Sequence, residues 1–277
     1  EITEKKRFNR VVLQGVPVNA AEELQEQVFS KIDRVVLTSA TLTTHKGFEF
    51  IQERIGFEPQ EQSILDSPFD YSNQALIYIS GDLPEPSEEI EKYASAMARR
   101  CGELVEISQG RAFILFTSYA LMDQVYDRLQ HLSSKLSLLR QGEIPTGQMI
   151  RRFKKTPAVI FGTNSFWQGV DIPGDALKSV IITKLPFDVP SEPLTEARIE
   201  DLRRRSIDPF SHYQIPRAII QMKQGFGRLI RKQSDTGVVS ILDSRMIHRG
   251  YGKQFLDSLP SCKVVEDLNQ VKEFFKL

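Results

Sequence analysis

The stretch AVIFGTNSFWQGVDIPG, residues 158–174, joins a short apolar run to a polar, glycine-rich segment. The apolar run has little polar alternation, which is typical of a strand covered on both faces in a parallel sheet. In sheets of this kind, ligand-binding residues gather beyond the carboxyl ends of the strands. The stretch therefore predicts a buried strand that delivers polar side chains to one edge of a sheet.

Apolar runs of this kind alternate with amphipathic stretches along the chain. Predicted strands occupy residues 34–40, 75–80, 112–118, 158–163, 179–185 and 237–244. Predicted helices occupy residues 20–31, 88–107, 119–132, 147–154, 192–205 and 214–231. This alternation indicates right-handed crossovers, and so an α/β fold with a mainly parallel sheet and helices on both faces.

The composition of the chain is that of an ordinary globular protein. Its 277 residues are 40% hydrophobic and 26% charged, and the formal net charge is zero, which neither supports nor excludes nucleic-acid binding. Its two cysteines lie far apart, and no stretch resembles a signal peptide or a membrane span. We therefore expect a cytoplasmic protein with no membrane partner and no metal site. Because it begins with Glu1 and a polar segment, we expect a fragment of a longer polypeptide.

Polar side chains follow four of the predicted strands, at residues 38–41, 117–119, 162–165 and 243–245. Each of these ends, taken alone, is explained by hydroxyl or amide groups that cap the next helix. Four such ends at one edge of a sheet favour a shared binding cleft instead.

The segment QMKQGFGRLIR, residues 221–231, carries two arginines three positions apart. On a helix, Arg228 and Arg231 share one face, and paired guanidiniums suit a polyanion such as a triphosphate. Gly225 and Gly227 are poor helix formers, so they indicate close approach by another segment. A solvated basic helix face is the alternative, and the glycines weigh against it.

Residues 162–174 contain candidates for nucleic-acid contact. Thr163 and Asn164 can donate to a phosphate, and Asp171 can accept from a sugar hydroxyl or orient an arginine. Phe166 and Trp167 either stack on a base or pack in the core, and core packing is favoured for at least one of them.

Four motifs make the chain resemble the DinG/XPD family of superfamily 2 DNA helicases, its bacterial DinG-like branch above all. TSATL (38–42) resembles motif III, FTSY (116–119) motif IV, FWQGVDIPG (166–174) with KLPF (184–187) motif V, and QGFGRLIR (224–231) motif VI. The resemblance runs in order from about residue 11 to about residue 249. KLPF and FWQGVDIPG are specific to this family, whereas SAT and GRxxR are shared by many helicases.

The resemblance implies a RecA-like fold of the P-loop NTPase type. Residues 71–277 would form the helicase C-terminal motor domain, and residues 1–70 the end of the first motor domain with the connection between them. The implied function is ATP-dependent DNA unwinding, in DNA repair and with 5′-to-3′ travel.

The resemblance also implies roles for individual residues. The residues that act on ATP would be Arg228, Arg231 and Gln224. The residues that contact the nucleotide or position the arginines would be Gly169, Asp171 and Gly227. Residues that couple hydrolysis to domain movement would be Ser39, Ala40 and Thr41. Residues along single-stranded DNA would be Thr117, Ser118, Thr163 and Asn164.

The chain lacks a G-x-x-x-x-G-K-[ST] phosphate loop and an Asp-Glu box after a strand. ATP and Mg²⁺ would therefore be bound mainly by the first motor domain of the same polypeptide, and the isolated chain should be inactive. The iron–sulfur cysteines or exonuclease domain of some relatives would also lie upstream. Two alternatives remain: a DNA-stimulated ATPase or regulatory module of a nuclease that does not unwind, and a passive nucleic-acid-binding module.

Overall fold

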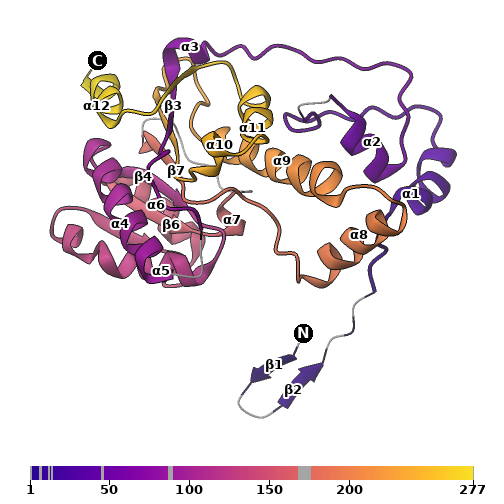
Figure 1. Ribbon diagram of the computed structural model, residues 1–277, viewed down its shortest axis with the longest axis horizontal. Helices are drawn as coiled ribbons and strands as arrows, with labels where there is room; N and C mark the ends of the chain where they lie inside the picture. The colour runs from indigo at the N-terminus through magenta and orange to yellow at the C-terminus, as the bar shows by residue number, and fades with distance from the viewer. Residues whose placement is uncertain are drawn as a thin grey trace.

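A seven-stranded sheet forms the centre of the molecule (Figure 1). The computed structural model describes residues 2–5, 8–11, 13, 15–44, 47–86, 90–167 and 176–276. The strand order is β5-β6-β4-β7-β8-β3-β9, and each neighbouring pair is parallel. The prediction of an α/β fold built on a parallel sheet is confirmed.

The strands of this sheet are short. Their bounds are β3 (Ala75–Ile79), β4 (Arg111–Leu115), β5 (Ser137–Arg140), β6 (Ala158–Gly162), β7 (Ser179–Ile182), β8 (Gly237–Ile241) and β9 (Lys263–Val265). The five central strands were predicted, because burial on both faces makes each one a continuous apolar run. The edge strands β5 and β9 were not predicted, because most of their residues are partly or fully exposed.

Two hydrophobic clusters lie on opposite faces of the sheet. Along β3, Ile77 and Ile79 belong to one cluster, while Leu76 and Tyr78 belong to the other, as the alternation of side chains along a strand requires. The first face is covered by α6 (Thr146–Lys155), α7 (Asn164–Trp167), α9 (Ile215–Phe226) and α11 (Gly252–Ser258). The second face is covered by α4 (Ile90–Ile107), α5 (Tyr119–Arg128) and α12 (Leu268–Lys276).

The predicted strand at residues 34–40 is wrong. No strand is assigned there, and the Val36 side chain is 87% exposed. A β-branched run forms a strand only where a neighbouring strand accepts its backbone hydrogen bonds and covers its side chains. The described residues supply no such neighbour, and within 13, 15–44 and 47–73 no described side chain is buried.

The N-terminal region begins with an antiparallel hairpin of β1 (Ile2–Lys5) and β2 (Phe8–Val11). It continues through α1 (Ala21–Gln27), η1 (Phe29–Lys31) and α2 (Glu49–Ile55), which lie near α8 (Pro193–Arg204) and α9 in Figure 1. The remaining elements are α3 (Tyr71–Gln74), η2 (Gln130–Ser134), the π-helical turn η4 (Phe210–Gln214) and α10 (Arg245–His248). Within the described ranges, no helix is long and apolar enough to cross a membrane.

Candidate nucleotide and nucleic-acid site

Helix α9 ends at Phe226, so Arg228 and Arg231 do not lie on a helix face as predicted. Residues 227–229 form a turn in which Arg228 N donates to Gly225 O at 3.2 Å and Leu229 N to Phe226 O at 3.0 Å. The low helix propensity of the two glycines explains why the helix stops before the arginines.

Gly225 lies against the indole ring of Trp167. A Cβ atom at residue 225 would be 2.9 Å from Trp167 Cζ3 and 3.0 Å from Cε3, so the predicted close approach is confirmed at this glycine. Gly227 caps α9 and differs, because among the described residues a Cβ there would meet only Lys223 O and Gln224 O of the same helix. Gly225 therefore allows close packing against Trp167, whereas Gly227 ends the helix.

We expect Gly225→Ala to destabilise the chain by about 1–3 kcal/mol, because the added methyl group overpacks the indole. Gly227→Ala is the matched control and should change the free energy of unfolding far less, since that position is exposed. Urea denaturation of both variants measures the difference. Equal effects at the two positions would contradict this assignment.

Trp167 and Phe166 are both buried, so core packing is confirmed for the two aromatic residues. Trp167 Nε1 donates to Phe116 O at 3.3 Å, which joins the segment after β6 to the segment after β4. Its carbonyl oxygen accepts from Arg228, at 3.2 Å from Nε and 2.7 Å from Nη2. Trp167 therefore connects the segments that resemble motifs IV, V and VI.

Arg228 and Arg231 are half-buried cations. Burial lowers the pKa of both guanidiniums, and in Arg231 the charge of Asp235 opposes this shift. Both remain charged, because an arginine does not lose its proton in a protein. Nearby on α9, Gln224 Oε1 is buried without a hydrogen-bond partner among the described residues. Two half-buried cations suit a phosphate-bearing ligand, because guanidiniums donate to phosphate oxygens. The Gln224 Oε1 suits a donor of the ligand, such as a hydroxyl or amino group.

The loop after Leu229 is held by two residues that the sequence analysis did not find. Asp235 Oδ2 accepts from the backbone N of Arg231 and of Lys232, each at 2.9 Å. Gln74 Nε2 donates to three carbonyls of this loop, at residues 232, 233 and 235, over 2.9–3.1 Å. The available signal for Gln74 was a glutamine placed immediately before an apolar run.

Thr163 lies at the carboxyl end of β6 and is buried. Its backbone N and its Oγ1 both donate to Gln141 Oε1, at 2.7 and 3.1 Å, and Gln141 Nε2 donates to Tyr119 Oη at 2.8 Å. Gln141 was also missed by sequence reasoning. The Thr163 hydroxyl is thus engaged inside the protein, and its contact with a phosphate stays a prediction.

The other predicted strand-end residues differ in their surroundings. Ser118 caps α5, because its Oγ accepts from Leu121 N at 3.4 Å. Thr117 is half-buried, and its hydroxyl makes no hydrogen bond with a described residue. Asn164 opens α7, but its side chain, like Gly169 and Asp171 as a whole, lies outside the described residues.

Three of the four segments of the expected cleft lie at one edge of the sheet, since β4, β6 and β8 are parallel strands of one sheet. A shared cleft at this edge stays a prediction. Asp243, beyond β8, is buried and accepts from Leu185 N at 2.8 Å and Arg245 Nη2 at 2.6 Å. Its carboxylate therefore anchors the KLPF segment. Residues 38–41 follow no strand, so that part of the prediction is wrong.

The predicted coupling residues form a local turn. Ser39 Oγ lies 3.3 Å from Thr41 Oγ1 and accepts from Thr41 N at 3.2 Å, while Ser39 and Ala40 are exposed. Two residues further on, Thr43 contacts α9 through Lys223 Nζ, which donates to Thr43 O at 3.0 Å. The residue that follows the segment resembling motif III therefore contacts the helix that leads into motif VI.

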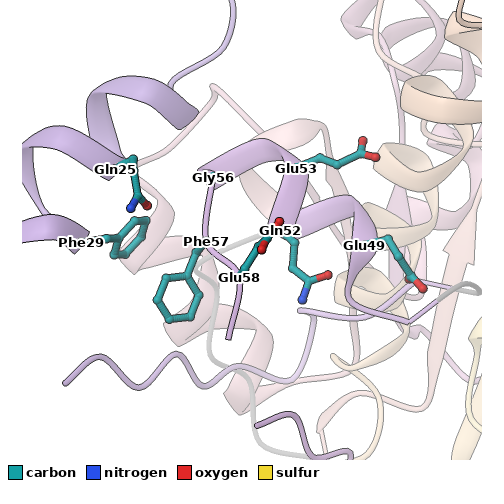
Figure 2. A pocket seen from close by; sticks show the side chains of 8 residues that line it. All are labelled: Gln25, Phe29, Glu49, Gln52, Glu53, Gly56, Phe57 and Glu58. Atoms are coloured by element: carbon teal, nitrogen blue, oxygen red, sulfur yellow. The ribbon is translucent and has the colours of Figure 1, made fainter. Parts of the chain in front are cut away.

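The cavity in Figure 2, of about 610 Å³, lies in the N-terminal region. Its lining residues are Gln25, Phe29, Glu49, Gln52, Glu53, Gly56, Phe57 and Glu58. Three carboxylates and no cation face it, which does not suit phosphate, and none of the predicted site residues lines it. We therefore exclude this cavity as the nucleotide site.

The comparison with known families agrees with this geometry. Residues 101–262, more than half of the chain, match the family described as the helicase C-terminal domain. This chain belongs to the helicase C-terminal domain family. The matched region contains the segments that resemble motifs IV, V and VI, so the predicted family resemblance is confirmed.

Relatives with similar sequences carry helicase or nuclease names. The ATP-dependent DNA helicase YoaA of Haemophilus influenzae is 42% identical over 94% of this chain, which spans 40% of that protein. The 3′-5′ exonuclease DinG of Bacillus subtilis is 36% identical over 96% of this chain, which spans 29% of that protein. The chain thus spans less than half of these relatives' length.

A solved structure of an XPD helicase has the same fold. It aligns with a TM-score of 0.63 and 18% identity, and the match covers 90% of this chain and 45% of that one. At this identity the likeness concerns the fold alone, and it confirms the prediction of a RecA-like fold.

Proposed function

We propose that this chain is the C-terminal motor part of an ATP-dependent DNA helicase. Residues 71–277 form its second motor domain, and residues 1–70 complete or lead out of the first. The observation that carries the proposal is the bond from Arg228 to Trp167 O, at 2.7 Å, because it fixes a half-buried guanidinium beside the segment that follows β6. DNA repair and 5′-to-3′ travel belong to the same proposal.

The residues present fit a nucleotide whose phosphates are held mainly elsewhere. Arg228, Arg231 and Gln224 offer donors and one unused acceptor, whereas the described residues contain no group of three or more metal-ligating side chains. Mg²⁺, which neutralises phosphate charge when bound, would be held by the first motor domain, together with the phosphate loop that this chain lacks. This chain's part is to bring a cation to the phosphoryl group as negative charge develops on it.

Single-stranded DNA is the proposed second ligand. Thr117, with a hydroxyl that has no described partner, and the exposed Ser118 stand at the carboxyl end of β4, next to the end of β6. Hydroxyl and backbone N–H groups at such an edge hold phosphates without reading bases. The names of the helicase relatives, ATP-dependent DNA helicases, support DNA as the nucleic acid.

A second candidate function is a DNA-stimulated ATPase or regulatory module of a nuclease. It is favoured by one observation, the relative named 3′-5′ exonuclease DinG at 36% identity. Strand displacement separates the two candidates, because only a helicase releases the displaced strand in an ATP-dependent manner. A passive nucleic-acid-binding module would show no dependence on ATP.

We expect the isolated chain, mixed with ATP, Mg²⁺ and single-stranded DNA, to release no phosphate beyond its own molar amount. The reason is that it carries two cations for the phosphates but no phosphate loop. The full-length protein should hydrolyse ATP in a DNA-dependent way and displace a strand under the same conditions. Multiple turnovers by the isolated chain would contradict the proposal that ATP hydrolysis requires the first motor domain.

A further inference from the structure

Lys223 joins α9 to the N-terminal region across 180 positions of sequence. Its Nζ donates to Thr43 O at 3.0 Å and to Thr43 Oγ1 at 3.1 Å. Two acceptors on one residue fix the lysine head group in both distance and direction. This is a specific contact rather than general proximity of two surfaces.

The charged head group of Lys223 is partly removed from water, and the contact with Thr43 explains why it lies there. Lys223 is half-buried, and burial lowers the pKa of its ammonium group. Within the described part of the chain, no carboxylate forms an ion pair with it. Partial removal of an ammonium group from water costs free energy, and neutral oxygens offset only part of this cost. An exposed lysine at this position would avoid the cost but would lose the link to Thr43.

Each end of the link lies beside further hydrogen bonds. Lys223 lies inside α9, five positions before Arg228, whose guanidinium is bonded to Trp167 O. Thr43 precedes a turn closed by two backbone bonds, from Thr44 N to Gly47 O at 2.9 Å and from Gly47 N to Thr44 O at 3.1 Å. The contact therefore joins the helix that leads to Arg228 with a residue beside a hydrogen-bonded turn.

The other contacts between these regions lie elsewhere. Arg198 Nε donates to Val18 O at 3.2 Å, and the Arg54 guanidinium lies 5.4 Å from the centre of the Tyr213 ring. These contacts dock the N-terminal region on α8 and η4. Lys223, by contrast, is on the helix that leads directly to Arg228, and Thr43 is two residues from Thr41.

We propose that Lys223 is a positioning residue that couples the segment at 38–43 to α9. It touches neither ATP nor DNA in this role. When Arg228 changes its contacts with a phosphoryl group, α9 shifts, and Lys223 carries that shift to the segment that resembles motif III. This inference rests on the proposed motor function and deepens it by naming the residue that links hydrolysis to movement.

The test uses the full-length protein with Lys223→Met, Lys223→Arg and Thr43→Val. We expect Lys223→Met to keep the KM for ATP and the melting temperature, while the base pairs unwound per ATP hydrolysed fall by roughly fivefold or more. Lys223→Arg can still donate to both oxygens of Thr43. It should therefore retain most of the wild-type number of base pairs unwound per ATP. Thr43→Val should lower it less, because the backbone carbonyl remains. Lys253→Met, an exposed lysine on α11, is the matched control.

A second readout does not depend on unwinding. The affinity for a single-stranded oligonucleotide is measured with and without a non-hydrolysable ATP analogue, and Lys223→Met should lose the change that the analogue causes in the wild-type protein. If the wild-type protein hydrolyses ATP but displaces no strand, the proposed helicase function is contradicted. The change in oligonucleotide affinity caused by the ATP analogue still tests the role of Lys223. The inference is overturned if Lys223→Met and Thr43→Val keep both the ratio and the affinity change, or if hydrolysis and unwinding fall in equal proportion.

Discussion

Replacing Arg228 by alanine in the full-length protein is expected to lower kcat for ATP hydrolysis by roughly a thousandfold or more, the loss typical of a missing arginine finger. The guanidinium is half-buried, so its charge acts through a medium that screens it less than water does. Its bond to Trp167 O also orients it before the nucleotide arrives, which removes a reorganisation cost from the reaction. Steady-state hydrolysis at saturating ATP and single-stranded DNA measures the effect.

Two further variants make the Arg228 result interpretable. Arg228→Lys keeps the charge but lacks the planar fork that serves a carbonyl and a phosphate together, so we expect an intermediate kcat. Arg204→Ala, at the exposed end of α8, should leave kcat unchanged. An Arg228→Ala protein that is folded and hydrolyses ATP at the wild-type rate would favour a passive nucleic-acid-binding module over a motor.

The apolar surface of the N-terminal region bears on the same proposal. Leu13 is 93% exposed, Val36 87% and Leu65 88%, although each is large and apolar. Burial of such side chains under another surface is favourable. They support the proposal that a first motor domain of the same polypeptide packs here, and they explain why residues 34–40 read as a buried strand.

The central sheet could be predicted from the sequence because its information is local. Each inner strand is an apolar run, and each is followed by polar residues and a helical period. The end of α9 could not be placed in the same way, since the period of apolar residues continues through Leu229 and Ile230, which are buried although they lie beyond the helix. Their burial comes from the turn that packs on the sheet, which periodicity alone does not distinguish from a helix.

The residues that support the candidate site were harder to predict than its charged residues. Arg228 and Arg231 stand out in a motif, whereas Gln74 acts on a loop 158 to 161 positions away. Gln141 and Thr163 meet only because β5 and β6 are neighbours, and β5 itself has no continuous apolar run. Contacts of this kind follow from the topology of the sheet, so the sequence names the chemical groups but not the residues that hold them.

Replacing Trp167 by alanine is expected to cost about 3–5 kcal/mol in the free energy of unfolding, the range for loss of a large buried aromatic side chain. The indole is fully buried, and it fills the space that Gly225 leaves open. Its loss also leaves Phe116 O without the donor Nε1. Urea denaturation of the chain measures the cost, and a loss below about 1 kcal/mol would contradict the packing role.

A double-mutant cycle tests whether Trp167 and Gly225 form one packing unit. In the structure, a methyl group at residue 225 would collide with Cζ3 and Cε3 of the indole six-membered ring. Phenylalanine at residue 167 presents a smaller ring, so Gly225→Ala should cost less in the Trp167→Phe background than in the wild type. The expected coupling is about 0.5–3 kcal/mol, the range for residues in direct contact. Additive losses would mean that the two segments are stabilised separately, and that the position of Arg228 does not depend on the fit between this ring and this glycine.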